Sequence, residues 1–531
     1  MKSKKFLCLA LSAFLTLGMV GCGSNTKNNK EASAETAQTE KAKIKDGGTM
    51  VFSSTTDPTC LNPFFQNNRV TFTVNNALFD PLFVADKDET RYYLADNMEV
   101  SEDKLTYKIK LKDNLKWHDG EKITADDLIF TINMAKDEKQ GIADRQTFII
   151  DGKEVEVKKI DDLTVEFKLP QAYAPFDAGI GSLRILPKHI FDGEKNLAQS
   201  EKNNNPIGSG PFKFKEWKKG ETLSLERFDD YYSGRPHLDG IVYRIIPDAN
   251  SGKVAFENGE VSATYLSEEK YERFSQDENF KTYSFDEGML NYIIFNEKNE
   301  NLKKKEVRQA ICYALDKEEI LKTIFKNLEN TQKAYSILVP STKYYTEDVE
   351  KYENNIEKAK ELLKKAGAEN IKLEFQYNAG DDNIVMMVKQ QLEKIGIEVE
   401  PKQIDTNAFF AKLFGEQERD YDIIYNGYVM GSDPDGYASA FVKDGEMNAQ
   451  FYDNKELDEL WKKGAKEVDE NKRKEIYEKI QKTIADDAVV YPIEYTKSLI
   501  GVSAKIGGVE EAKLVPIYMF EDLSKLYMTE E

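Results

Sequence analysis

A strand, a helix and a second strand follow one another between residues 371 and 400, and this order restricts the fold more than any other feature of the chain. Apolar and polar residues alternate at 373–377, as in a half-buried strand. An apolar face then recurs every three or four residues at 385–395, and the alternation returns at 397–399. A helix that joins two strands over so short a distance implies a right-handed crossover between parallel strands. We therefore expect a mixed α/β fold.

Residues 80–204 have the pattern of a small α/β unit. Alternation at 105–111 and at 165–169 predicts two half-buried strands. Between them, Thr124 precedes Asp127 by three residues at the head of an apolar run, which resembles a capping box with Asp in place of Glu. A helix is therefore expected to begin at this point.

The second half of the chain has longer helical patterns. An apolar stripe at 356–366 ends at Gly367, a residue suited to the left-handed conformation that closes many helices. A helix-rich stretch at about 455–487 precedes an apolar run at 489–495. Because Pro492 lies inside this run and lacks an amide N–H, we expect an edge strand or the end of a strand here.

The first 22 residues have the pattern of a targeting segment. Three lysines within residues 2–5 precede an apolar run of about fifteen residues, which is too short to span a membrane comfortably. We expect residues 1–21 to be a secretion signal. Its end, Met19-Val20-Gly21-Cys22, resembles the bacterial lipobox, whose cysteine thiol receives diacylglycerol before the signal is removed. An ordinary signal peptide that happens to contain a cysteine is the alternative.

The segment at 23–46 is too polar to fold by itself. It contains no aromatic residue and a single large aliphatic residue, Ile44. Such a segment buries too little apolar surface to offset its ordering entropy, so we expect a flexible tether after a lipidated Cys22, with the fold beginning near Gly47. No other segment holds about twenty consecutive apolar residues, the length of a membrane-spanning helix. The lipid would then be the only membrane attachment.

The composition argues against several classes of protein. The chain has 94 acidic against 74 basic residues and a formal charge of −20, which argues against nucleic-acid binding. Its three histidines are too few and too scattered for a histidine-rich metal site. Cys60 and Cys312 are the cysteines left for the fold. We expect two buried free thiols, although an extracytoplasmic location would permit a disulfide.

Motifs of common enzymes are absent from the sequence. It contains no G-x-S-x-G, H-E-x-x-H, C-x-x-C or phosphate-binding G-x-x-x-x-G-K-[ST] pattern. Residues 433–436, Asp-Pro-Asp-Gly, begin like a calcium loop but have the glycine in the wrong place, so a turn is expected. We therefore predict no catalytic residue, no metal site and no cofactor.

Several separate motifs follow one another in a fixed order along the chain. They are Asp57-Pro58-Thr59-Cys60-Leu61-Asn62-Pro63, Ala77-Leu78-Phe79-Asp80-Pro81-Leu82, Lys116-Trp117-His118-Asp119-Gly120, Pro206-Ile207-Gly208-Ser209-Gly210-Pro211-Phe212, Asn258-Gly259-Glu260-Val261 and Val307-Arg308-Gln309-Ala310-Ile311. Together they resemble the solute-binding proteins of peptide and nickel ABC importers, and most of all the Gram-positive oligopeptide-binding lipoproteins. The resemblance covers essentially all of residues 47–531.

The resemblance implies a two-lobed fold of the periplasmic-binding-protein type, with three domains and a ligand cleft between the lobes. The lobes would close on the ligand by bending at a hinge. A peptide would be held by strand-like hydrogen bonds to its main chain. The expected domains are residues 47–79, 205–290 and 500–531 for a discontinuous domain I, 80–204 for domain II and 291–499 for domain III.

Two segments are the expected ligand contacts. The main-chain groups of Thr59 and Cys60 correspond to a strand that lines the cleft in the family, although packing within domain I is an equal alternative. The motif at 117–120 is expected to be structural, with a buried Trp and a turn, rather than ligand-binding. The second segment supplies Tyr428, Met430, Gly431, Ser432 and Asp433.

The second segment departs from the family pattern at one position. Enteric receptors of the family carry an Asp there that pairs with the α-ammonium of the peptide, whereas this chain has Met430 or Gly431. A buried ammonium without a counter-charge is costly. Either Asp433 or another acid therefore replaces the missing Asp, or longer peptides extend past this point. The pattern suggests peptides longer than dipeptides and tripeptides.

The resemblance thus implies a receptor that is lipid-anchored to the outer face of the cell membrane and delivers oligopeptides to the permease subunits of an ABC importer. We expect a monomer that catalyses no reaction and binds no nucleic acid. A receptor for nickel chelates or oligosaccharides with the same fold is one alternative. A lipoprotein for peptide-pheromone sensing or adhesion is another.

Overall fold

The computed structural model describes residues 43–530, apart from residues 67, 379 and 415–417. The expected signal peptide, Cys22 and most of the expected tether lie outside the described residues. Within the described part of the chain, no helix combines the length and apolarity needed to cross a membrane.

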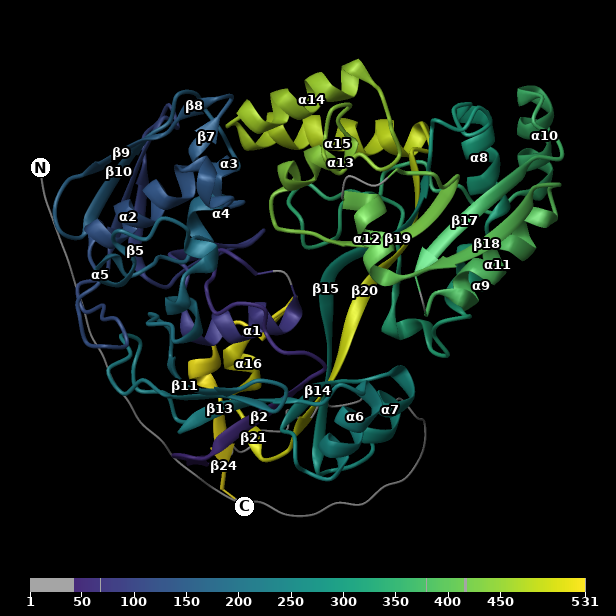
Figure 1. Cartoon of the computed structure of the whole chain (residues 1–531). Helices are drawn as coiled ribbons and strands as arrows, with labels where there is room; N and C mark the ends of the chain where they lie inside the picture. The colour runs from purple at the N-terminus through teal and green to yellow at the C-terminus, as the bar shows by residue number, and fades with distance from the viewer. Residues whose placement is uncertain (1–42, 67, 379, 415–417, 531) are drawn as a thin grey trace, which may run out of the picture. The chain divides into compact units, whose positions relative to one another are not determined.

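The largest sheet among the described residues has eleven strands, which come from both the N-terminal and the C-terminal parts of the sequence (Figure 1). Ten of its strands follow one path, on which β13, β2 and β14 are parallel neighbours, while β16 pairs with β20 off this path. In path order, the strands are β11 (Phe212–Lys218), β12 (Thr222–Arg227), β13 (Gly240–Ile245), β2 (Thr49–Ser54), β14 (Ala263–Tyr265), β20 (Val490–Ser503), β15 (Phe280–Phe295), β19 (Ile423–Val429), β17 (Lys372–Asn378) and β18 (Glu398–Ile404); β16 is Gln332–Lys333.

Two long antiparallel strands, β15 and β20, form the middle of this sheet (Figure 1). They have 16 and 14 residues. The expected domain borders at 290/291 and 499/500 fall inside them, so domains I and III would share these continuous strands. Strands that pass from one domain to the next are natural hinge elements.

The expectation that Pro492 marks an edge strand or a strand end is wrong. Pro492 lies inside β20, opposite Tyr292 of β15. The pairing register of the two strands shifts between Asn291 and Tyr292, and on the other side β16 pairs only with Glu494 and Tyr495. This local irregularity accommodates a residue that has no N–H to donate.

The strand, helix and strand that restrict the fold are confirmed. Strands β17 and β18 are parallel and are joined by α11 (Asp382–Glu393). Helix α10 (Ile356–Ala366) ends at Gly367, whose φ of +58° is left-handed. The other helices of this half are α8 (Lys305–Ala314), α9 (Lys317–Leu321), α12 (Thr406–Phe414), α13 (Ala438–Phe441), α14 (Lys455–Lys466) and α15 (Glu470–Asp486).

Residues 95–168 form a separate antiparallel sheet in the order β5 (Ala95–Val100), β6 (Thr106–Leu111), β10 (Thr164–Lys168) and β9 (Glu156–Lys159). Helix α2 (Ala125–Lys136) begins at Thr124, and Thr124 and Asp127 form the predicted capping box. The small α/β pattern of this segment is therefore confirmed. Next to it lie the hairpin β3 (Phe83–Ala85) and β4 (Thr90–Tyr92) and the helices α4 (Phe176–Gly181) and α5 (Lys188–Phe191).

The fold begins earlier than the sequence predicts. Strand β1 (Ile44–Lys45) pairs with β24 (Tyr527–Thr529), and Asp46 pairs with Arg235 at 2.8 Å. Residues 44–46 are thus part of the fold and not of a tether, because the C-terminal strand offers them a partner that composition cannot reveal. Remaining elements used below are α1 (Arg69–Leu78), α6 (Ala249–Glu257), α7 (Glu268–Phe274), β21 (Ile506–Gly507), α16 (Val509–Ala512), β22 (Leu514–Val515) and β23 (Met519–Phe520).

Two of the sequence motifs meet in the core. Trp117 is fully buried. Nδ1 of His118 accepts a hydrogen bond from the N–H of Gly208, and Nε2 donates one to the carbonyl of Gly210, both at 3.0 Å. A Cβ on Gly208 would lie 1.9 Å from the carbonyl oxygen of Leu78, so only glycine fits there. His118 is therefore saturated by the backbone, as expected of a structural motif.

Candidate functional site

The segment at 426–433 begins in the sheet and leaves it as a loop. Residues 426–429 pair with residues 289–292 of β15. The ring of Tyr428 meets that of Tyr437 edge to face, with 5.6 Å between centroids, and its hydroxyl lies 3.5 Å from Met447 Sδ. Tyr428 remains half-buried, so one side of the ring is still open to solvent or ligand.

Met430 and Gly431 differ sharply in their surroundings. Met430 is buried in the core, and its N–H donates to the carbonyl of Gly288 at 2.6 Å. Gly431 is exposed, and its carbonyl accepts from Thr342 Oγ1 at 2.9 Å. Of the two residues at the position of the missing Asp, the structure therefore turns only Gly431 outward.

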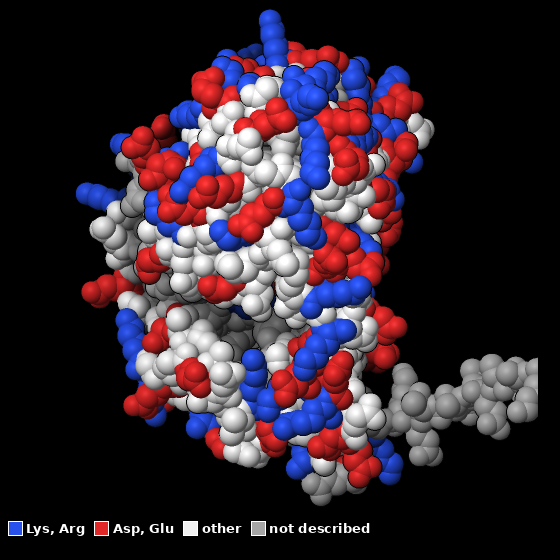
Figure 2. All heavy atoms as spheres, turned by 90° about the vertical axis from the view of Figure 1, so that its right-hand side faces the viewer, with Lys and Arg blue, Asp and Glu red and all other residues white. Residues whose placement is uncertain are grey.

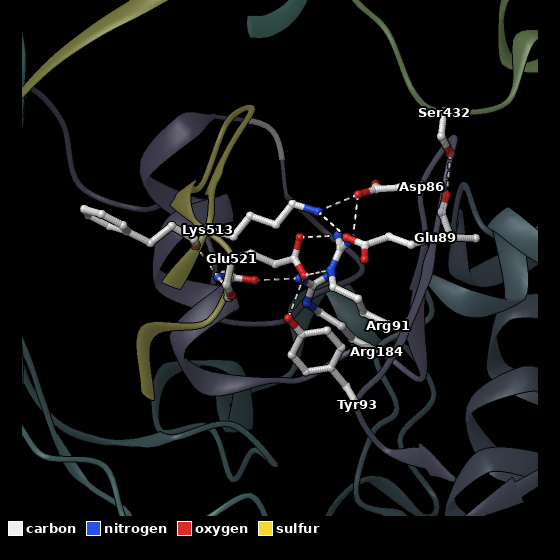
Figure 3. Close-up of polar contacts among 11 residues, drawn as sticks. Asp86, Glu89, Arg91, Tyr93, Arg184, Ser432, Lys513 and Glu521 are labelled. Atoms are coloured by element: carbon white, nitrogen blue, oxygen red, sulfur yellow. Dashed lines mark hydrogen bonds and ion pairs between the residues drawn. The ribbon is translucent and has the colours of Figure 1, made fainter. Parts of the chain in front are cut away.

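Ser432 connects segments that are far apart in the sequence (Figure 3). Its Oγ donates to the carbonyl of Ala85 at 2.7 Å, and its own carbonyl accepts the N–H of Lys343 at 2.8 Å. Ala85 belongs to expected domain II and Ser432 to expected domain III. Further contacts between these two domains are Ala174 N–H to Ala465 O (2.8 Å), Lys466 Nζ to Asp151 Oδ2 (2.9 Å) and Lys87 Nζ to Pro340 O (3.0 Å).

A group of ion pairs fixes the hairpin that carries Ala85 (Figure 3). Arg91 of β4 pairs with Asp86 at 2.7 Å and with Glu521 at 2.5 Å. Lys513 also pairs with Asp86, at 2.9 Å. Because Lys513 and Glu521 come from the C-terminal segment of expected domain I, the acceptor of the Ser432 hydrogen bond is held in place by domain I.

Asp433 already has a counter-charge within the chain. Its carboxylate accepts from both terminal nitrogens of Arg473, at 2.7 and 2.9 Å. The guanidinium is almost fully buried and also donates to the carbonyl of Gly464 at 3.0 Å. Asp433 further caps the short helical turn at Pro434–Tyr437 by accepting the N–H of Asp435. The hypothesis that Asp433 replaces the ammonium-binding Asp therefore loses its physical basis, although the predicted turn is confirmed.

Asp177 is an acid near this loop that lacks such a partner. Its Oδ1 is buried and has no hydrogen-bond partner among the described residues. Burial raises the pKa of Asp177, whereas the charges of Lys104 and Lys343 and a hydrogen bond with Tyr107 lower it, and Asp433 raises it further. Asp177 lies on α4, three residues after the interdomain hydrogen bond of Ala174. The structure thus places a carboxyl group with one unpartnered oxygen near the contact between domains II and III.

Thr59 and Cys60 lie on another element, just before α1. The N–H of Thr59 donates to Thr71 Oγ1 at 2.9 Å, so this amide is already used within the chain. Cys60 and Cys312 are both free thiols, as expected, but only Cys312 is buried, whereas Cys60 is half-buried. Residues 62 and 63 pack inward, and this leaves the edge of the loop, including Cys60, partly open.

The structure has a cavity of about 550 Å³ whose lining residues precede and follow Thr59 and Cys60 in the sequence but do not include them. It lies at the carboxyl ends of the parallel strands β2, β13 and β14, where open α/β sheets usually bind ligands. Residues 52–56 and 68–70 line it on both sides of the predicted segment. Further lining residues are Tyr243, Lys253, Tyr265 and Tyr518. The sequence offers no local signal for this cavity, because its walls come from segments as far apart as Phe52 and Leu523, which only the tertiary structure brings together.

The charged surface shows no single dominant sign. Lys and Arg side chains are interspersed with Asp and Glu over the face presented in Figure 2, and the surface is hollowed between its upper and lower parts. The described residues also contain no group of three or more His, Cys, Asp or Glu that could hold a metal ion. The mixed charges on the face in Figure 2 do not form the basic patch that is typical of a nucleic-acid interface.

A two-lobe α/β fold with hinge strands and a strand-end cavity is typical of solute-binding receptors. Residues 89–449 match the family described as bacterial extracellular solute-binding proteins, family 5 Middle. The match covers more than half of the chain, and the chain belongs to this family of receptors. The resemblance seen in the sequence and the α/β two-lobe fold that it implied are thereby confirmed.

Individual relatives agree along nearly the whole chain. The oligopeptide-binding protein AppA of Bacillus subtilis is 31% identical over 517 residues, covering 92% of this chain and 93% of AppA. The crystal structure of the ABC transporter substrate-binding protein CtaP of Listeria monocytogenes matches with a TM-score of 0.88 and 43% identity, over 92% of this chain and 100% of CtaP. The structure of Bacillus subtilis AppA in complex with a nonapeptide matches with a TM-score of 0.77 and 29% identity, over 92% of this chain and 100% of that one.

Proposed function

We propose that this chain captures oligopeptides outside the cytoplasm and delivers them to the permease subunits of an ABC importer. The observation that carries this proposal is its 31% identity to an oligopeptide-binding protein along almost the whole of both chains. The structural relative whose complex contains a nonapeptide supports a ligand longer than a tripeptide. The receptor catalyses no reaction and works as a monomer without a cofactor.

The expected closing motion has a physical basis in the long strands. Strands β15 and β20 continue through the expected borders of domains I and III, so bending them moves one domain against the other. The hydrogen bond from Ser432 to Ala85 joins domains II and III. In this proposal it forms when the lobes close on a peptide and breaks when they open.

The peptide lies along the exposed edges that the two predicted segments present. Tyr428, Gly431 and Ser432 contact it from domain III, and the half-buried Cys60, beside Thr59, contacts it from domain I. Met430 and Asp433 hold this loop in place, Met430 by packing in the core and Asp433 by pairing with Arg473. Asp177 takes the peptide ammonium in place of the missing Asp, because a carboxylate oxygen that is buried without a donor gains most from a cationic partner.

The N-terminal segment keeps the receptor at the membrane. Residues 1–21 are the cleaved signal, and Cys22 carries the lipid, so that captured peptides are released beside the importer. In cells labelled with a palmitate analogue, the Cys22→Ala variant should incorporate no label. Unchanged labelling of this variant would show that the lipid is attached elsewhere.

Native mass spectrometry of residues 23–531, purified without denaturation, tests the ligand class directly. Spectra before and after gentle unfolding identify whatever is released. A ladder of peptides of similar length and mixed sequence is the expected result. Release of a nickel chelate or a sugar would contradict the proposal. If the protein is empty, a synthetic oligopeptide that binds, added at one hundred times its dissociation constant, should stabilise it by about 2.7 kcal/mol, and no stabilisation by any peptide tested would count against the proposal.

A further inference from the structure

The cavity at the ends of β2, β13 and β14 has an unusual charge for this chain. Acidic residues outnumber basic ones by 94 to 74 in the whole sequence. The described residues that line the cavity nevertheless include two cations, Arg69 and Lys253, and no Asp or Glu. The other polar lining groups are hydroxyls and an amide, such as Ser53, Thr56 and Asn68.

Lys253 is the cation of this cavity that has no direct ion pair within the described residues. It lies in α6, is half-buried, and makes no hydrogen bond or ion pair to any residue that the structure describes. The two nearest acids along the chain are Glu257 and Asp248. Glu257 pairs with Arg273 at 2.6 Å. Asp248 accepts from the N–H and the hydroxyl of Ser251 at 2.7 Å, and it interacts with Lys253 through its charge without a direct contact. A half-buried lysine without a direct ion pair can take a counter-ion from a ligand.

Arg69 forms the opposite wall and is held rigidly. Its guanidinium donates to Glu287 Oε1 at 2.8 Å and to the hydroxyl of Tyr265 at 2.7 Å. Glu287 is buried in β15 and also accepts the N–H of Ile517 at 3.1 Å. These contacts leave the Arg69 Nε–H without a partner in the described part of the chain, on a side chain that is 45% exposed. A further donation goes to the carbonyl of Ile517 at 3.3 Å. The wall is therefore preorganised, and two of the five N–H donors of Arg69 remain, on Nε and on one terminal nitrogen.

We propose that this cavity is a subsite for a carboxylate of the bound peptide, with Lys253 as its counter-ion and the hydroxyls of the wall as further donors. The inference rests on the proposed peptide-binding function and specifies which chemical group the cavity selects. A carboxylate would be the direct counter-ion of Lys253, whereas an ammonium or guanidinium would meet Lys253 and an arginine that is already paired with Glu287, with no acid among the lining residues. The carboxylate comes either from an acidic side chain or from the C-terminus of the peptide, and both present the same group to the cavity.

Calorimetric titration of residues 23–531 with two synthetic peptides and two positional sets of peptides separates these sources. The probes are an alanine nonapeptide with a free carboxyl terminus, its C-terminal amide, and two sets of amides that carry one Glu or one Gln at each position in turn. The protein variants are Lys253→Gln and, as a matched control, Lys215→Gln. Lys215 is exposed in β11, in the same expected domain but outside the cavity, so its substitution changes the net charge equally.

Lys253→Gln should weaken by about 5-fold the peptides that place a carboxylate in the cavity and should leave the all-amide peptide unchanged. If the free-terminus peptide is the one affected, the C-terminus occupies the subsite. If a Glu peptide is affected and its Gln counterpart is not, an acidic side chain does. Lys215→Gln should change none of them.

The inference is overturned if Lys253→Gln weakens charged and neutral peptides equally, or weakens none. In either case the peptides still bind, and the proposed function stands. If the unaltered protein binds none of the probes and native mass spectrometry releases no peptide, the proposed function and this inference fall together.

Discussion

The carboxylate of Asp433 accepts hydrogen bonds from both terminal nitrogens of Arg473, at 2.7 and 2.9 Å, although the two residues are 40 positions apart. The rings of Tyr344 and Tyr477 lie 5.5 and 5.1 Å from the guanidinium carbon, so the pair is enclosed as well as hydrogen-bonded. This arrangement fixes the loop after β19 to α15. It makes Asp433 a support of the candidate site rather than a group that is free to meet a ligand.

Asp433→Asn should therefore lower stability strongly. The substitution leaves a buried guanidinium without its counter-charge, and we expect a loss of about 3 kcal/mol in the free energy of unfolding. Urea unfolding measures this loss. Asp348→Asn is the matched control, because Asp348 pairs with Lys482 at 2.6 Å on the surface, where its side chain is 84% exposed. The control should leave stability nearly unchanged, because solvent screens this exposed pair. Equal effects of the two substitutions would show that the Arg473 pair is not stabilising.

Asp177→Asn should change the recognition of peptide amines. If the unpartnered Oδ1 of Asp177 meets the ammonium, the variant should weaken peptides with a free N-terminus by about 10-fold more than their N-acetylated counterparts. Titration calorimetry with both peptide forms gives the ratio. Asp433→Asn, measured under conditions where it is folded, should affect both forms alike. A ratio near one for Asp177→Asn would reject this assignment.

Ser432→Ala should shorten the residence time of a bound peptide. The variant loses the hydrogen bond to Ala85 that joins domains II and III, worth about 1 kcal/mol, so release should accelerate by about 5-fold. Stopped-flow displacement of a fluorescent peptide measures the rate. Ser439→Ala is a suitable control, since Ser439 is also half-buried but has no side-chain hydrogen bond within the described residues. An unchanged release rate for Ser432→Ala would show that the contact does not hold the lobes closed.

His118 should make the fold sensitive to mild acid. Burial lowers the pKa of His118 from 6.5 to about 4. Between these values the unfolded chain binds more protons than the folded one, so the contribution of His118 is complete above pH 6.5 and is lost as the pH falls towards 4, by about 3 kcal/mol in all.

Urea unfolding at about pH 7 and about pH 4.5 tests this contribution. His118→Gln should be less stable at neutral pH, because it loses the two backbone hydrogen bonds, but it should show a smaller drop between the two pH values. His237→Gln alters a partly exposed ring and should keep the full drop. The same drop in all three proteins would mean that other groups cause the acid sensitivity.

The local elements followed from the sequence because their signals are local. The periodicity of residues 373–399 predicts β17, α11 and β18, Gly367 ends α10, and Thr124 with Asp127 begins α2. Side chains three to four residues apart share a helix face, and alternate residues share a strand face, so each pattern reports directly on burial. The ordered motifs identified the family, which the comparisons confirm.

The site depended on contacts that no local pattern encodes. Pro492 reads as a strand end, but a register shift in its partner strand makes room for it inside β20. From the sequence, Asp433 is an acid that could meet a ligand, but in the structure Arg473 of α15 pairs with it. The walls of the cavity come from α1, α6, β14 and the segment before β23.

By itself, the sequence thus determined the elements, the family and the segments to inspect. The tertiary structure alone decided which polar groups are paired within the chain, such as Asp433 with Arg473, and which have an unpartnered atom, such as Oδ1 of Asp177. The physical reason is that burial and charge pairing depend on distance in space, and pairing across the sheet joins residues hundreds of positions apart.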